Sequence, residues 1–186
     1  MRAPFIALLL LCSTPARAGD STPSVDSVTN PEMTAIFIAD QAAREHPATV
    51  DWNVVRPADR ARRSRTQALL DAGSLNSGDD FLHAAYVFQH GDDPEDFLKA
   101  HALAMVAVAR GKPEATWIAA ATLDRYLQRI GQSQIYDTQF THPPKQKWTQ
   151  EPYRRDLLPD ALWQATGVPT IAQQQDQLKD WARQMP

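Results

Sequence analysis

The chain has 186 residues, of which 43% are hydrophobic and 22% charged, and its formal net charge is −3. These proportions are those of an ordinary globular domain, and they exclude an intrinsically disordered or fibrous chain. An acidic balance also disfavours nucleic-acid binding, because the phosphate backbone attracts basic surfaces. We therefore expect one folded domain without nucleic acid among its partners.

The first 18 residues have the pattern of a cleavable secretory signal peptide. Arg2 precedes an apolar run over residues 4–12, and small residues at 16 and 18 precede Gly19. This apolar run is well short of the roughly 20 residues that span a bilayer, so an uncleaved anchor is the weaker alternative. The pattern predicts a periplasmic or secreted protein with no stable membrane insertion after cleavage.

Cys12 is the only cysteine in the chain. It follows Leu11, whereas a lipid-anchor signal needs a small residue there, so lipidation is a minor alternative. Cleavage after residue 18 removes this cysteine, and with it disulfides, thiol catalysis and cysteine-ligated zinc. Residues 19–29 are polar and lack a hydrophobic period, which predicts a flexible tether before a single helical domain over residues 30–186.

Capping residues, prolines and glycines divide this domain into helices joined by short connections. The expected fold is all-α, with six to seven helices in antiparallel hairpins and one long extended loop near residues 131–155. The helices are predicted over residues 31–46, 57–72, 79–90, 94–110, 114–130, 159–166 and 169–185.

Two features of these helices bear on function. The basic run from Arg56 to Arg65 is interpreted as a solvated helix face rather than an anion site. The helix over residues 114–130 has an apolar stripe that predicts its buried side. This stripe consists of Trp117, Ala120, Ala121, Leu127 and Ile130.

Four segments of the chain resemble a family of uncharacterised bacterial helical proteins, known as a domain of unknown function. They are His83–Gly91 (HAAYVFQHG), Ala100–Gly111 (AHALAMVAVARG), Trp117–Leu127 (WIAAATLDRYL) and Gly131–Phe140 (GQSQIYDTQF). The resemblance extends from about Asp40 to Leu178 and implies one helical domain, without an established activity. In that family the turn after the fifth helix usually reads Gly-Thr-Gln, whereas this chain has Asp137-Thr138-Gln139.

Folding the helical hairpins back on each other places His83, His101 and Asp124 at nearly one height. These three are the candidate catalytic residues, because a buried carboxylate needs a partner and two histidines supply one. A structural His–Asp hydrogen bond is the main alternative, and a divalent metal site is the least favoured. His90 lies seven residues after His83, too far along the helix axis for both to hold one metal ion, and its place before Gly91 is typical of a helix cap.

The extended loop carries the second group of candidates. Neutral amides and hydroxyls beside an aromatic ring suit sugars or peptide backbone rather than phosphate. The alternative is that these side chains bind the loop's own backbone groups. The candidate ligand-binding residues are His90, Arg125, Gln134, Tyr136, Thr138 and Gln139.

The chain has no phosphate-binding loop, no HExxH motif and no Gly-x-Ser-x-Gly motif. The sequence therefore predicts no cofactor and no defined metal centre. The leading hypothesis is an exported module that binds a partner protein or a small ligand of the cell envelope. The rival hypothesis is a hydrolase that uses the His/Asp layer, possibly with a metal.

Overall fold

The computed structural model describes residues 28–46, 49–143 and 147–184. Within these ranges the protein has seven helices and no strand, and two isolated β-bridges join Gln134 to Tyr153 and Thr141 to Thr149 across the long loop. The prediction of an all-α fold is confirmed. The helices are α1 (Pro31–Ala42), α2 (Trp52–Asp71), α3 (Gly78–Phe88), α4 (Pro94–Ala109), α5 (Ala115–Arg129), α6 (Asp160–Ala165) and α7 (Ile171–Gln184).

The predicted signal peptide and most of the predicted tether lie outside the described residues. None of the helices in the described ranges is long and apolar enough to cross a membrane. Helix α1 begins with a cap, in which the Asn30 side chain accepts hydrogen bonds from the amides of Glu32 and Met33. This cap is the one that the Asn-Pro-Glu sequence predicts.

The second helix starts earlier than the sequence predicts. Asp51 caps it by accepting a hydrogen bond from the Asn53 amide, so α2 begins at Trp52 and Pro57 lies inside it. A proline inside a helix removes one hydrogen bond to the carbonyl four residues earlier. That carbonyl belongs to Asn53, and both residues are exposed, so the site is open to solvent. The predicted start at Pro57 is therefore wrong.

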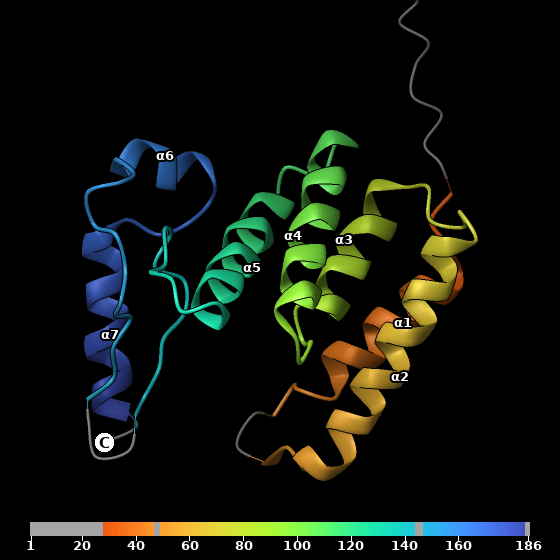
Figure 1. Ribbon diagram of the computed structural model, residues 1–186, viewed down its shortest axis with the longest axis horizontal. Helices are drawn as coiled ribbons and strands as arrows, with labels where there is room; N and C mark the ends of the chain where they lie inside the picture. Colours follow the sequence, from red (N-terminus) through yellow and green to blue (C-terminus); the bar gives the residue numbers. More distant parts are fainter. Residues whose placement is uncertain (1–27, 47–48, 144–146, 185–186) are drawn as a thin grey trace, which may run out of the picture.

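The helices follow one another along the longest axis of the molecule (Figure 1). Helix α4 packs against α3 on one side and α5 on the other, and α1 and α2 cover the far side of α3. Alanines at the α3–α4–α5 interfaces let the helix backbones approach closely. Those that are at most 5% exposed are Ala84, Ala85, Ala100, Ala104, Ala107, Ala115 and Ala119.

Helix α5 also contacts the C-terminal part of the chain. Ala120 packs with Trp163 and Val168 in a second hydrophobic cluster, separate from the main core. The predicted buried stripe of α5 is only partly correct, because Trp117 and Ile130 are 41% and 44% exposed. They lie near the two ends of α5, whereas Ala120, Ala121 and Asp124 lie between them and are buried.

Candidate functional site

The structure does not bring His83, His101 and Asp124 together. The His83 ring stacks on Phe37 of α1, with ring centroids 4.2 Å apart and planes 10° apart, so it faces away from α5. Burial lowers the pKa of His83, and its Nδ1 atom has no hydrogen-bond partner in the described chain. His101 does face α5, but its Nδ1 lies 2.9 Å from the carbonyl oxygen of Ala119, more than one turn before Asp124.

Asp124 is fully buried, as the sequence predicts, but its partners belong to the loop that follows α5. Oδ1 accepts hydrogen bonds from the amides of Ile135 and Tyr136, and Oδ2 accepts from the amide and hydroxyl of Thr138. Burial raises the pKa of Asp124, and these four donors oppose that shift because they stabilise the carboxylate. Asp124 therefore anchors the loop after α5 and does not form the predicted layer with His83 and His101.

No three His, Cys, Asp or Glu side chains in the described residues form a group that suits a metal ion. This finding applies to the three candidates above as well. The metal-dependent version of the layer has no support in their geometry, because each side chain faces a different neighbour: Phe37, Ala119 and the loop.

The Gln134 side chain binds the loop itself. Gln134 is fully buried and donates from Nε2 to the carbonyl oxygens of Gln139 and Gln150, while its Oε1 accepts from the Gln139 amide. Tyr136 packs against the cluster around Trp163. The hydrogen bonds of Gln134 and the contacts of Tyr136 therefore fit the alternative that these side chains bind the loop and do not bind a ligand.

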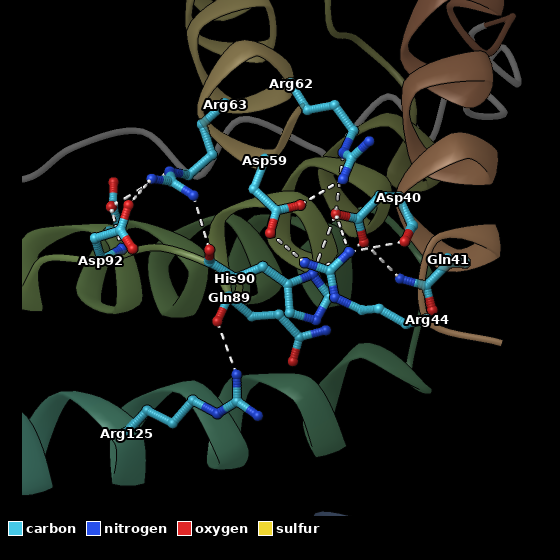
Figure 2. Close-up of polar contacts among 11 residues, drawn as sticks. Asp40, Gln41, Arg44, Asp59, Arg62, Arg63, Gln89, His90, Asp92 and Arg125 are labelled. Carbon is cyan, nitrogen blue, oxygen red and sulfur yellow. Dashed lines mark hydrogen bonds and ion pairs between the residues drawn. The ribbon is translucent and has the colours of Figure 1, made fainter. Parts of the chain in front are cut away.

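A polar network connects α1, α2 and the end of α3 (Figure 2). Asp40 is fully buried, and Arg44 Nη1 lies 3.1 Å from its Oδ1. The Arg44 guanidinium also reaches Asp59, whose second oxygen is bound by Arg62, with both N–O distances at 2.5 Å. These hydrogen bonds lower the pKa of Asp59 and outweigh the opposing effect of its burial, which is the largest single contribution.

His90 belongs to this network and is more than a helix cap. Its Nδ1 lies 2.9 Å from Oδ2 of Asp40, and its carbonyl oxygen accepts a hydrogen bond from Arg63. Arg63 also pairs with Asp92 in the turn between α3 and α4. The basic run of α2 is therefore only partly solvated, because Arg62 and Arg63 are largely buried against acids whereas Arg60 and Arg65 are exposed.

The network forms one wall of a cleft of about 800 Å³ that lies near the start of α2 and the ends of α3 and α5. Four arginines and two aspartates line it, and both aspartates are already paired with arginines. The lining therefore carries excess positive charge on a protein that is acidic overall. The lining residues include Arg44, Trp52, Arg56, Asp59, Gln89, His90, Asp92, Phe97, Arg125, Arg129 and Gln139.

Arg125 is the most informative residue of this cleft. Its Nη1 donates to the Gln89 carbonyl at 2.8 Å and its Nε donates to Oε1 of Gln139 at 2.7 Å, so both described acceptors are uncharged. Burial lowers the pKa of Arg125, and the nearby charges of Arg44 and Arg129 lower it further. A buried cation that has other cations as neighbours favours an anion beside it.

Three of the predicted ligand-binding residues, His90, Arg125 and Gln139, line this cleft. The candidate residues predicted from the sequence do not include Arg44, Asp40 and Asp59, although their spacing carries a signal. Asp40 and Arg44 are four residues apart, and Asp59 and Arg62 are three apart, which are the separations of neighbours on a helix surface.

Comparison of the chain with models of protein families, with curated proteins and with solved structures gives no match. The resemblance to the bacterial family therefore stays a prediction.

Proposed function

We propose that the protein is an exported binding module whose cleft holds a small organic anion through a carboxylate or phosphate group. The observation that carries the proposal is Arg125, which is largely buried, has Arg44 and Arg129 as charged neighbours, and donates to uncharged oxygens. Guanidinium groups bind both anions with paired, charge-assisted hydrogen bonds. This proposal differs from the sequence-based suggestion of sugars or peptide backbone as ligands, which rested on the loop amides.

The cleft offers more than charge. Its volume is within the range of small-molecule sites, and it has an aromatic wall in Trp52, which is 49% exposed, and in Phe97. Arg129 lies over the Phe97 ring, 5.5 Å from its centroid, so this arginine is held at the rim. These features support a ligand with an acidic group and an apolar or ring-shaped body.

Export completes the proposal. The pattern of residues 1–18 favours cleavage and release into the periplasm or the medium. A binding module in that compartment would meet anionic ligands of the cell envelope, and we expect a small ligand rather than a partner protein because the charged residues line a cavity.

Isothermal titration with succinate and with inorganic phosphate tests this proposal. The wild-type protein is expected to bind at least one of the two probes saturably, and Arg129→Gln should weaken that binding about tenfold by removing a positive charge from the rim. Arg129 is exposed, so this variant should fold normally. Arg60→Gln, an exposed arginine of α2 outside the cleft, is the matched control and should bind as the wild type does.

A hydrolase is the second candidate function, now with different residues. Asp40 holds Nδ1 of His90, and this arrangement orients an imidazole so that Nε2 can take a proton from water. His90 also lines the cleft beside the arginines. The observation that favours this candidate is the Asp40–His90 pair, which takes the place of the predicted His/Asp layer.

Hydrolysis of p-nitrophenyl phosphate and of the p-nitrophenyl monoester of succinate tests the second candidate. If His90 is a general base, the wild type should hydrolyse one of these esters and the His90→Gln variant should not. The affinity of the variant for inorganic phosphate or succinate should stay within a factor of about three of the wild-type value. No turnover of either ester by the wild type would leave the binding module as the function.

A further inference from the structure

A second cavity, of about 360 Å³, lies on another side of α5, bordered by the turn at residues 137–140 and the start of α7. Two aromatic side chains, Trp117 and Phe140, and three glutamines line it. It shares Arg125 and Gln139 with the first cleft. The residue that sets it apart is Asp137, a side chain that neither the proposed anion site nor the hydrophobic clusters use.

Asp137 is only 2% exposed, yet its Oδ1 has no hydrogen-bond partner in the described part of the chain. Buried carboxyl oxygens are normally paired, because removing them from water without a partner is unfavourable. Asp137 also lines the cavity. Asp137 therefore has an unpaired carboxyl oxygen and lies in the wall of a cavity that is large enough for a small ligand.

The backbone conformation at position 137 also makes an aspartate unusual there. Its φ is +56°, in the left-handed region that glycine adopts most easily. Asp137 adopts this conformation because the amides of the residues on either side, Tyr136 and Thr138, both donate to the Asp124 carboxylate. A glycine would meet this requirement without strain and without a buried carboxyl group, so the anchor does not explain the aspartate.

The charged groups around Asp137 come from α5 and from the loop segment 151–155. Burial has the largest effect on the pKa of Asp137, the charges of Asp124 and Glu151 add to it, and Arg155 opposes them, with the result that the pKa rises from 3.8 to about 8. Asp137 in turn helps to raise the pKa of Tyr153. The charge of Arg155 thus offsets only part of the effect of burial and of the two neighbouring carboxylates on Asp137.

We propose that this second cavity binds a primary ammonium group on an aromatic or apolar body, with the Asp137 carboxylate as its counter-ion. The ammonium supplies the donor that Oδ1 lacks, and Trp117 and Phe140 line the cavity with aromatic rings, the side-chain type that attracts organic cations. Arg125 lines the cavity too, and because its described acceptors on Gln139 and Gln89 are neutral its charge opposes the ammonium group, so the Asp137 carboxylate must outweigh it.

The site predicts a measurable proton release. Below pH 8 the free protein holds a proton on Asp137, and binding of the ammonium ion requires that this proton leave the carboxyl group for the buffer. One proton is released for each ligand bound, and the apparent affinity increases about tenfold per pH unit until the carboxyl group is ionised in the free protein. A neutral ligand would release no proton.

The experiment uses benzylammonium as the probe and benzyl alcohol as its neutral counterpart. Titration calorimetry at pH 6 and pH 8, in two buffers with different ionisation enthalpies, gives affinity and proton release for the wild type, Asp137→Asn and Asp137→Gly. The second variant keeps the turn relaxed, so a loss of binding is separable from a loss of folding. Asp156→Asn, an exposed aspartate of the same loop, is the matched control.

We expect saturable binding of benzylammonium, at least tenfold weaker binding of benzyl alcohol, and proton release at pH 6. Both Asp137 variants should fold and lose benzylammonium binding by at least tenfold, while Asp156→Asn should keep it. The proposal is overturned if millimolar benzylammonium does not bind the wild type, if benzyl alcohol binds equally well, or if Asp137→Asn retains the affinity. Arg129→Gln should leave benzylammonium binding unchanged, which separates this site from the anion cleft.

Discussion

Two polar regions of the molecule hold buried carboxylates by different means. In the network beside the first cleft, Asp40 and Asp59 are neutralised by Arg44, which follows α1, and by Arg62 of α2. After α5, Asp124 is held by three backbone amides and one hydroxyl of a loop. Both arrangements satisfy the carboxylate, but the partners in the first are charged and those in the second are not.

This difference explains why each region has its own kind of cavity. Arginines that reach from several helices leave extra cations beside the network, and these line the first cleft. Backbone amides carry no net charge, so the loop around Asp124 leaves Asp137 buried next to another carboxylate. The comparison predicts one region that attracts anions and another that attracts cations.

Removing the Asp124 carboxylate should have the largest effect on stability. Asp124→Ala leaves three buried amides without their acceptor, so we expect a loss of about 3–5 kcal/mol in the free energy of unfolding. Urea denaturation followed by circular dichroism measures this change. A loss below about 1 kcal/mol would contradict the role of Asp124 as the anchor of the loop.

Asp59→Asn breaks the arginine-bridged network and should cost about 2–3 kcal/mol at pH 7. The folded-state pKa of Asp59 lies below its ordinary value of 3.8, so its contribution is complete above that value and disappears as the pH falls through the folded-state pKa. The difference in melting temperature between the wild type and the variant should therefore shrink as the pH is lowered below 3.8. A difference that does not shrink on acidification would exclude the ionic contribution.

Asp137→Gly should stabilise the protein without ligand, by about 1 kcal/mol from the relaxed backbone alone. The raised pKa of Asp137 also means that the folded state holds a proton that the unfolded state has lost, between about pH 4 and pH 8. This residue therefore reduces stability as the pH rises through that window, and the variant should lack the decline. Melting temperatures at pH 5 and pH 8 measure both effects, and a lower melting temperature for the variant at pH 8 would contradict them.

His101→Ala should cost about 0.5–1.5 kcal/mol, because it removes one hydrogen bond to the Ala119 carbonyl. The effects of His101→Ala and Asp124→Ala should add, since the two side chains have separate partners. A coupling above about 1 kcal/mol in the double variant would restore the predicted layer.

The helices could be predicted from local sequence signals, and the structure contains the caps and turns that these signals indicate. Asn30 and the Asp93–Pro94 pair both act at helix starts, and glycines at 73, 111, 131 and 167 have positive φ after helix ends. The burial of Asp124 also followed from its place on the α5 stripe. Caps and periodicity depend on neighbouring residues, so one chain is enough to recognise them.

The partners of the buried polar groups depend on how helices and loop are placed in three dimensions. Spacing put His101 and Asp124 at one height, but it did not show that the loop turns back over Asp124. Likewise, nothing local indicates that Arg63 reaches the carbonyl of His90, 27 residues away. The sites can therefore be recognised only from long-range contacts, whereas the helices can be predicted without them.

The most direct test of the anion cleft is an NMR titration that follows the arginine side-chain Nε–H signals while succinate or inorganic phosphate is added. The account predicts saturable shifts for Arg125 and Arg129 with one apparent dissociation constant, and no saturable shift for Arg60. Equal, non-saturating shifts of all exposed arginines, or an Arg125 signal that does not respond to either anion, would contradict the claim that this cleft is a binding site.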